Sequence, residues 1–72
     1  MATNKEKGTE QFKQKNFDKA VEFYTKAFEE NPSDHTILGN RSAAFHNLKQ
    51  FDKALEDAQK CIEIKKDWAK GY

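Results

Sequence analysis

The feature that most constrains this chain is an eight-residue string that occurs twice, 34 positions apart. Residues 15–22 read KNFDKAVE, and residues 49–56 read KQFDKALE. When the chain is shifted against itself by 34 residues, small residues also fall on small residues outside that string, as with Gly8 opposite Ser42 and Ala27 opposite Cys61. The chain is therefore expected to contain two copies of one structural unit.

Each unit is predicted to consist of two helices, because its apolar residues recur at helical spacing. Ala20, Tyr24 and Ala27 fall on one helical face. Thr3 and Glu6 form a T-x-x-E capping box, which indicates a helix start. No segment shows the period-2 alternation of a strand, so the predicted class is all-α. The expected helices cover residues 3–15, 17–30, 35–48 and 51–64.

The recurring letters have a physical reason in the packing of antiparallel helices. Small residues such as Ala20 and Ala54 are needed where two helix backbones approach each other. Phe17 and Phe51 stand at the turn of each hairpin, where both rings are expected to be buried. One hairpin cannot bury its apolar face alone, so the second is expected to stack on the first. Tandem antiparallel helix hairpins are therefore predicted.

Composition excludes several functions. Thirteen Lys and Arg against twelve Asp and Glu give a net charge of +1, which argues against a nucleic-acid binder. The chain has no apolar run long enough for a membrane span. Cys61 is the only cysteine, which favours a reducing compartment, by default the cytoplasm. His35 and His46 lack the neighbours of a zinc signature, and no catalytic motif occurs. No metal, cofactor or enzymatic activity is expected.

The 34-residue period resembles that of the tetratricopeptide repeat (TPR) family. The family's small, aromatic and proline positions are filled in the first copy by Gly8, Ala20, Tyr24, Ala27 and Pro32. The second copy departs from the pattern where Ala58 replaces the aromatic residue and Lys66 replaces the proline. The resemblance implies one TPR domain over residues 1–72, folded as a short superhelix. Repeat one would cover residues 1–34, repeat two 35–68, and the start of a third helix pair 69–72.

A narrower resemblance is to the N-terminal TPR domain of the Hsp70–Hsp90 organising, stress-inducible co-chaperones. It is carried by the strings NKEKG, GNRSAAF, ALEDAQKCIEI and DWAKGY. The resemblance implies a stress-response co-chaperone module that binds the acidic C-terminal peptide of a heat-shock chaperone, ending Glu-Glu-Val-Asp, through a carboxylate clamp. The clamp positions of that family fall on Lys5, Thr9, Asn40 and Lys70.

Two departures weaken the implied clamp. Thr9 stands where the family has Asn, and the family's Arg position would follow Tyr72. Further residues expected to line the same groove are Phe12, Lys13 and His46.

Elementary chemistry is compatible with this site. Lys5 and Thr9 are four residues apart and so share a helical face. Lysine and asparagine suit a terminal carboxylate. The simpler alternative is that Lys5 and Lys70 are only solvated lysines.

The alternative function is a purely structural or self-associating TPR fragment. The last hairpin would leave an apolar face around Ile62, Ile64 and Trp68 uncovered. A weakly stable domain and a weak homodimer through that face are therefore expected.

Overall fold

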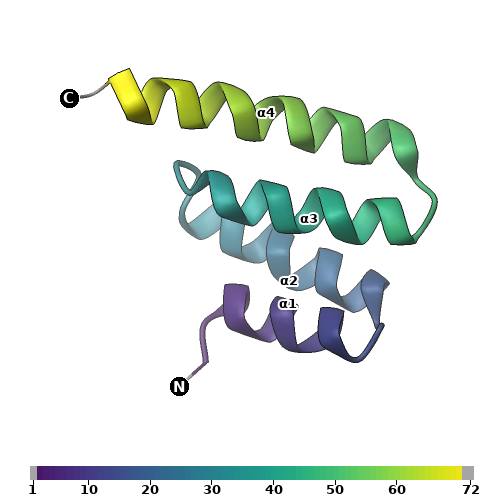
Figure 1. Ribbon diagram of the computed structural model, residues 1–72. Coiled ribbons are helices and arrows are strands. Elements are labelled where there is room, and N and C mark those ends of the chain that lie inside the picture. Colours follow the sequence, from purple (N-terminus) through teal and green to yellow (C-terminus); the bar gives the residue numbers. More distant parts are fainter. Residues whose placement is uncertain (1, 71–72) are drawn as a thin grey trace.

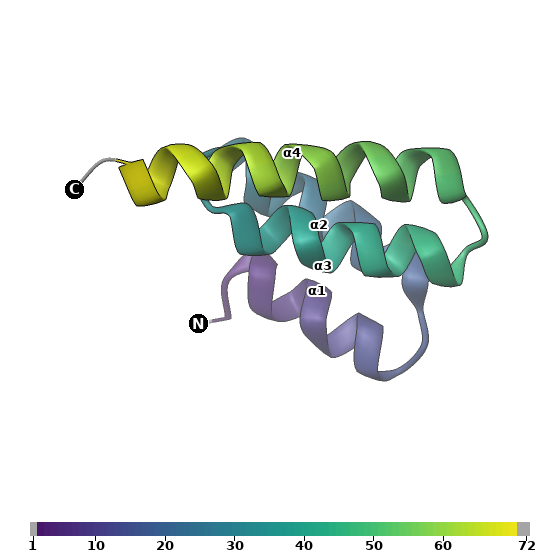
Figure 2. The ribbon, with the colours of Figure 1, turned by 45° about the horizontal axis from the view of Figure 1, so that its top comes forward.

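A computed structural model of the chain describes residues 2–70, with side chains from residue 2 to residue 66. Within these residues the structure is all-α, as predicted, and contains α1 (Asn4–Lys13), α2 (Phe17–Glu30), α3 (His35–Asn47) and α4 (Phe51–Lys70). Figure 1 shows two antiparallel hairpins, α1 with α2 and α3 with α4. They stack through α2 and α3 into a flat body of 37 × 32 × 17 Å, seen from a second side in Figure 2.

Side-chain caps start α1 and α3. Thr3 Oγ1 accepts a hydrogen bond of 3.1 Å from the Glu6 backbone N–H, and the Glu6 carboxylate accepts one of 3.3 Å from the Thr3 N–H. The predicted capping box is thereby confirmed. Asp34 caps α3 by accepting from the Thr36 N–H at 3.0 Å. These caps satisfy amide donors that have no partner within the helix.

The turns inside the two hairpins have the same backbone geometry. Lys15 has φ 65° and Lys49 has φ 63°, so each hairpin places a lysine in the left-handed region directly after its first helix. The following amide donates to the carbonyl five residues earlier, at 2.8 Å for Asn16 and 2.9 Å for Gln50. This arrangement satisfies carbonyl groups at a helix end. The internal repeat therefore extends to the backbone.

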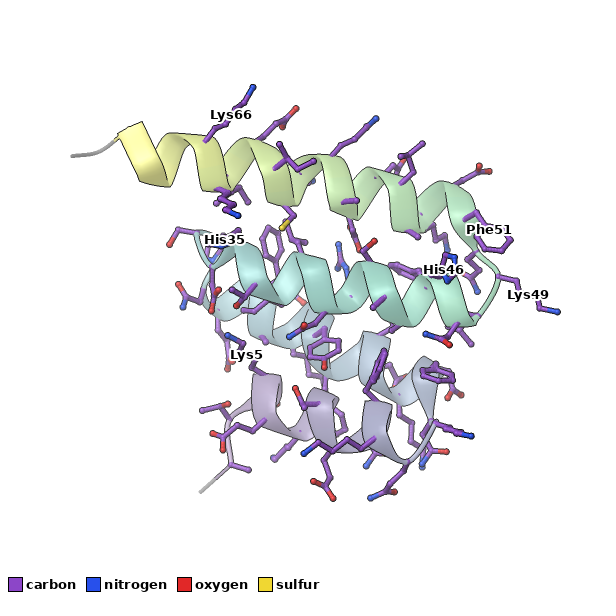
Figure 3. All side chains as sticks on the ribbon, in the orientation of Figure 1. Lys5, His35, His46, Lys49, Phe51 and Lys66 are labelled. Carbon is purple, nitrogen blue, oxygen red and sulfur yellow. The ribbon has the colours of Figure 1, made fainter. Side chains whose placement is uncertain are left out.

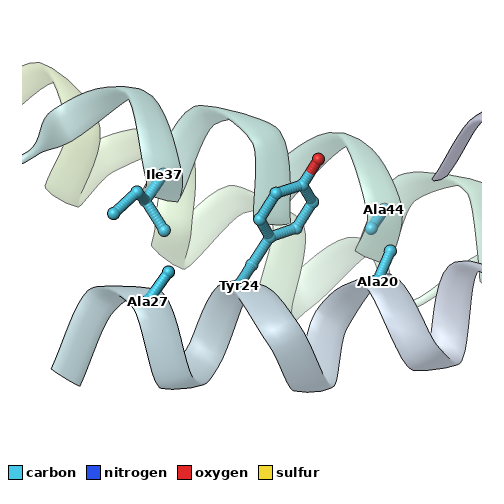
Figure 4. Close-up of a cluster of buried hydrophobic side chains, with 5 residues drawn as sticks. All are labelled: Ala20, Tyr24, Ala27, Ile37 and Ala44. Carbon is cyan, nitrogen blue, oxygen red and sulfur yellow. The ribbon is translucent and has the colours of Figure 1, made fainter. Parts of the chain in front are cut away.

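The core lies between the first three helices and is built around Tyr24, whose exposed fraction is 2 %. Gly8 of α1 gives the ring its space, because a Cβ at that position would lie 2.8 Å from two ring carbons. The cluster of buried apolar side chains, drawn in Figure 4, consists of Ala20, Tyr24, Ala27, Ile37 and Ala44.

The second hairpin has different side chains at the two equivalent positions. Ser42 stands at the Gly8 position, and Ala58 stands at the Tyr24 position. The Ser42 hydroxyl donates to the Ala54 carbonyl at 2.7 Å, so the larger residue is now on the first helix of the hairpin. The departure of Ala58 from the family pattern thus coincides with a larger residue on the facing helix.

Phe51 is 55 % exposed, so the prediction that it is buried at the turn is wrong. Its counterpart Phe17 is partly buried. Both rings make the same edge-to-face contact: the centroids are 5.1 Å apart for Phe17 and Phe12, and 5.2 Å apart for Phe51 and His46. The difference arises because α2 packs between α1 and α3, whereas α4 contacts only α3 among the described helices.

The last helix runs to Lys70 rather than ending at Ile64 as predicted. Pro32 follows α2, and proline ends helices because it lacks an N–H donor and restricts the residue before it. Its counterpart Lys66 keeps that donor, so α4 continues. Residues 69 and 70, expected to open a third helix pair, therefore belong to α4. Residues 71 and 72 lie outside the described residues.

A buried ion pair links three helices. Arg41 of α3 donates to Asp57 of α4 through Nε at 2.6 Å and Nη2 at 2.8 Å. Asp57 is 5 % exposed. The third guanidinium nitrogen donates to Thr25 of α2 at 3.2 Å, and the group lies 5.8 Å from the ring centroids of Phe28 and Phe45. Arg41 therefore fixes α3 against both of its neighbours.

Candidate functional site

Two hollows share Thr9 as a lining residue. The larger, of about 510 Å³, is lined by Thr3, Lys5, Glu6, Thr9, Glu10 and Lys13. The smaller, of about 250 Å³, lies where the first three helices meet and is lined by Thr9, Phe12, Tyr24, Asn40 and Ala43. Because Thr9 borders both, the two hollows adjoin at this residue; the larger is lined by α1 and its cap alone, and the smaller also by α2 and α3.

Most residues predicted for the site border these hollows, namely Lys5, Thr9, Phe12, Lys13 and Asn40. His46 lies instead at the turn between α3 and α4, exposed and beside Phe51, as Figure 3 shows. The side chain of Lys70 lies outside the described residues, so its predicted role stays a prediction.

Lys5 is already engaged within the chain. Figure 3 shows it at the start of α1, directed toward the beginning of α3, where His35 lies. Its Nζ donates to Asp34 Oδ2 at 3.2 Å and to Thr36 Oγ1 at 2.6 Å. The hydrogen bond from the Thr36 hydroxyl, together with the Lys5 ammonium, lowers the pKa of Asp34, although partial burial opposes them. Asp34 is therefore an anion at neutral pH.

Thr9 has its hydroxyl proton committed inside the protein. Its Oγ1 lies 3.1 Å from the Lys5 carbonyl oxygen and 3.0 Å from the Tyr24 hydroxyl. A threonine hydroxyl has one proton, and both neighbours can accept it. Thr9 can therefore accept a hydrogen bond from a ligand more readily than it can donate one.

Asn40 is the polar group best placed to contact a ligand. It is half-buried on α3 and borders the smaller hollow beside Thr9 and Tyr24. Among the described side chains, none forms a hydrogen bond with its amide, which offers two donors and an acceptor. The hollow thus combines an apolar wall from Phe12 and Ala43 with an unused amide.

Sequence reasoning missed two partners at this site. Asp34 was not predicted as a site residue, because the 29 positions between it and Lys5 hide their contact. The Tyr24 hydroxyl, which reaches Thr9, was counted only as part of an aromatic core position. No local pattern indicates either contact, since both depend on how α1 sits against its neighbours.

In the described part of the chain, no group of three or more His, Cys, Asp or Glu residues could hold a metal ion. No described helix has both the length and the apolar character needed to cross a membrane. Cys61 is half-buried, and its sulfur would lie 3.6 Å from a Cβ placed on Gly39, which fits the small packed residue predicted there.

The helix hairpins define a repeat protein, and comparison with known families agrees. Residues 4–34 and residues 35–67 each match the tetratricopeptide repeat family. The chain therefore belongs to the tetratricopeptide repeat family, and the repeats themselves are non-enzymatic protein-interaction modules.

Several curated proteins are similar to this chain over most of its length. The chain is 46 % identical over 68 residues to the Hsp70-Hsp90 organising protein of Plasmodium falciparum, and 46 % identical over 70 residues to heat shock protein STI1 of Saccharomyces cerevisiae. It is also 40 % identical over 68 residues to the E3 ubiquitin-protein ligase TTC3 of Mus musculus. Each match covers 94 % of this chain but only 27 %, 12 % and 3 % of those proteins, respectively.

Proposed function

We propose that the chain is a co-chaperone-type interaction module that binds the acidic C-terminal peptide of a heat-shock chaperone, of the Glu-Glu-Val-Asp type. The observation that carries this proposal is the placement of Lys5, Thr9 and Asn40 around two adjoining hollows. A lysine ammonium can form charge-assisted hydrogen bonds with a terminal carboxylate, and an asparagine amide adds a directional donor. The names of the relatives, which refer to Hsp70, Hsp90 and heat shock, favour a chaperone as partner.

The other predicted residues have secondary roles in this proposal. Phe12 offers apolar contact in the smaller hollow, and Lys13 offers a second cation in the larger one. Lys70 would supply a further cation for the terminal carboxylate. His46, which borders neither hollow, would contact only a ligand that reaches the end of α3 beside Phe51. We place the interaction in the cytoplasm, since a lone cysteine fits a reducing compartment.

We expect weak binding. Glu6 and Glu10 border the same hollow as Lys5, so its attraction for an acidic peptide is partly cancelled. Lys5 must also leave its internal partners. We therefore expect a Kd between about ten micromolar and one millimolar, or roughly 4–7 kcal/mol of binding free energy, with lower affinity at high salt.

Lys5→Ala is expected to weaken the binding of a Glu-Glu-Val-Asp peptide about ten- to hundredfold, because a charge-assisted hydrogen bond contributes about 1.5–3 kcal/mol. Asn40→Ala should weaken it less, since that bond is neutral on the protein side. Thr9→Asn should tighten binding, because an amide supplies donors that the committed threonine hydroxyl lacks. Titration followed by amide resonances would measure all three.

The matched control is Lys19→Ala, which removes an equal charge from an exposed position on α2 and should leave the affinity unchanged. Amidating the peptide's C-terminus should abolish most of the binding. If Lys5→Ala and Asn40→Ala both bind as the unaltered chain does, the peptide-binding proposal is wrong and a structural repeat unit takes its place.

Self-association is a second candidate, favoured by exposed apolar residues on α4. They include Ile62 of the predicted face but not Ile64, which is half-buried, and the side chain of Trp68 lies outside the described residues. Phe51, Leu55 and Ile62 are 55 %, 59 % and 58 % exposed, and their spacing places them on one helical face, here called the α4 stripe. Their counterparts in repeat one, which are partly buried, are Phe17, Val21 and Phe28. Exposed apolar faces of this kind are candidate interaction surfaces.

The outer surfaces of α1 and α4, at opposite ends of the helix stack, determine how two copies of the chain could associate. Side chains of α3 that face α2 include Ile37, Arg41 and Ala44. Their counterparts near and on α1 are the exposed polar residues Thr3, Lys7 and Glu10. The α1 of a second copy therefore cannot cover α4 in the way that α3 covers α2. A homodimer would instead join the two α4 stripes around a two-fold axis.

Sedimentation velocity over a wide concentration range is expected to detect a weak monomer–dimer equilibrium that Leu55→Glu abolishes, because a buried unpaired carboxylate is costly. Lys60→Gln, an equal change in net charge at an exposed position on a different face of α4, serves as the control. A strict monomer at every concentration would remove this candidate.

A further inference from the structure

The internal partner of Lys5 is a carboxylate, the same chemical group that the proposed ligand presents. Asp34 Oδ2 lies 3.2 Å from Lys5 Nζ, and the two side chains are 24 % and 38 % exposed. Both groups can therefore be reached from solvent. A peptide carboxylate that approaches Lys5 arrives at a cation already paired with an anion.

Asp34 also has partners that do not depend on Lys5. Its Oδ1 accepts hydrogen bonds from both the backbone N–H and the hydroxyl of Thr36. These two donors keep the carboxylate satisfied when the lysine swings away. A helix start further stabilises a negative charge at this position. Releasing Lys5 therefore leaves no unpaired carboxylate behind, which keeps the cost of the exchange small.

The lysine itself is nearly saturated. An ammonium group has three protons, and two of those on Lys5 are directed at Asp34 and Thr36. The paired state is therefore a competitor of the liganded state.

We infer that Asp34 is an internal competitor for Lys5 and sets the affinity of the site: a ligand carboxylate binds by displacing the Asp34 carboxylate from the lysine. This inference rests on the proposed function, because it concerns the same lysine. It predicts that the affinity is limited by the strength of the internal pair, and not only by the contacts made to the ligand.

Asp34→Asn separates the competitor from the cap. Asparagine caps helices about as well as aspartate, so α3 should keep its start, while the anion that holds Lys5 is removed. Binding of a Glu-Glu-Val-Asp peptide is expected to tighten about three- to tenfold. Asp18→Asn is the matched control, since it removes an equal charge from an exposed position in the first turn of α2. It should change the affinity less than twofold.

The same substitution in the Lys5→Ala background distinguishes competition from a general change in charge. There Asp34→Asn should have no effect beyond that of Asp18→Asn, because the lysine for which the two carboxylates compete is gone. A carbon-detected titration without peptide gives an independent measurement. The pKa of Asp34 should rise when Lys5 is replaced by alanine.

The outcomes separate the two proposals. If Lys5→Ala binds the peptide as tightly as the unaltered chain, this inference is wrong, and if Asn40→Ala does so as well, the proposed function is wrong too. If Lys5→Ala weakens binding but Asp34→Asn does not tighten it, this inference alone is wrong. Equal tightening by Asp18→Asn, persistence of the effect in the Lys5→Ala background, or an unmoved Asp34 pKa would also overturn it.

Discussion

Asp57→Ala is expected to lower the free energy of unfolding by about 3–5 kcal/mol, because it leaves a buried arginine without its counter-ion. Asp57 is 5 % exposed and receives two hydrogen bonds from Arg41. The guanidinium lies near the rings of Phe28 and Phe45, where little water can replace the lost carboxylate. Domains of this size are stable by only a few kcal/mol, so the variant should be largely unfolded at room temperature.

Urea unfolding followed by circular dichroism measures this loss. Asp52→Ala is the control, since it removes an exposed carboxylate from the same helix and should cost less than about 1 kcal/mol. Arg41→Lys should also be markedly destabilising, because lysine cannot reproduce the two-pronged geometry. A cost below about 1 kcal/mol for Asp57→Ala would mean that the ion pair does not hold α3 against α4.

The second large effect on the free energy of unfolding is expected at Gly8 and Tyr24, the contact pair that differs between the two repeats. Tyr24→Ala is expected to cost about 3–5 kcal/mol through loss of buried ring contacts. Gly8→Ser alone should cost about 1–3 kcal/mol, because its Cβ would lie 2.8 Å from the ring. The double variant reproduces the pair found in repeat two, Ser42 with Ala58. It should be more stable than Tyr24→Ala alone.

A double-mutant cycle on these two positions gives the coupling free energy directly. The gain in helix propensity from replacing glycine is the same in both backgrounds and cancels in the cycle. Costs that simply add would show that the two residues do not compensate each other. A favourable coupling would show that the residues at these two positions compensate each other, so that both departures of repeat two from the family pattern reflect the same packing contact.

Most of the fold could be predicted from the spacing of the repeat. Periodicity and the Thr3 capping box located three of the four helices to within about two residues, because those signals are local. The predicted end of α4 at residue 64 was wrong, because Lys66 does not provide the helix stop that Pro32 provides after α2. Burial of Phe51 was wrong because the repeat implies a neighbouring helix that is not among the described ones.

The candidate site was predicted less completely than the fold. Helical spacing correctly placed Lys5 and Thr9 on one face. It could not show that a carboxylate 29 positions away holds the lysine. The ion pair of Arg41 and Asp57 could not be predicted either, because these residues are 16 positions apart on different helices. Long polar side chains select partners according to tertiary packing, and a linear pattern does not contain that information.

The helices of this protein contact mainly their neighbours in order, with only a few contacts between α1 and α3. In such a quasi-linear arrangement, local opening starts at the ends, where a helix has one neighbour instead of two. The ten-residue α1 is such an end and holds Lys5 and Thr9, whereas Asn40 belongs to the better-anchored α3. A ligand that contacts both α1 and α3 would therefore hold α1 against the rest of the protein. Part of its binding free energy would go into keeping α1 folded.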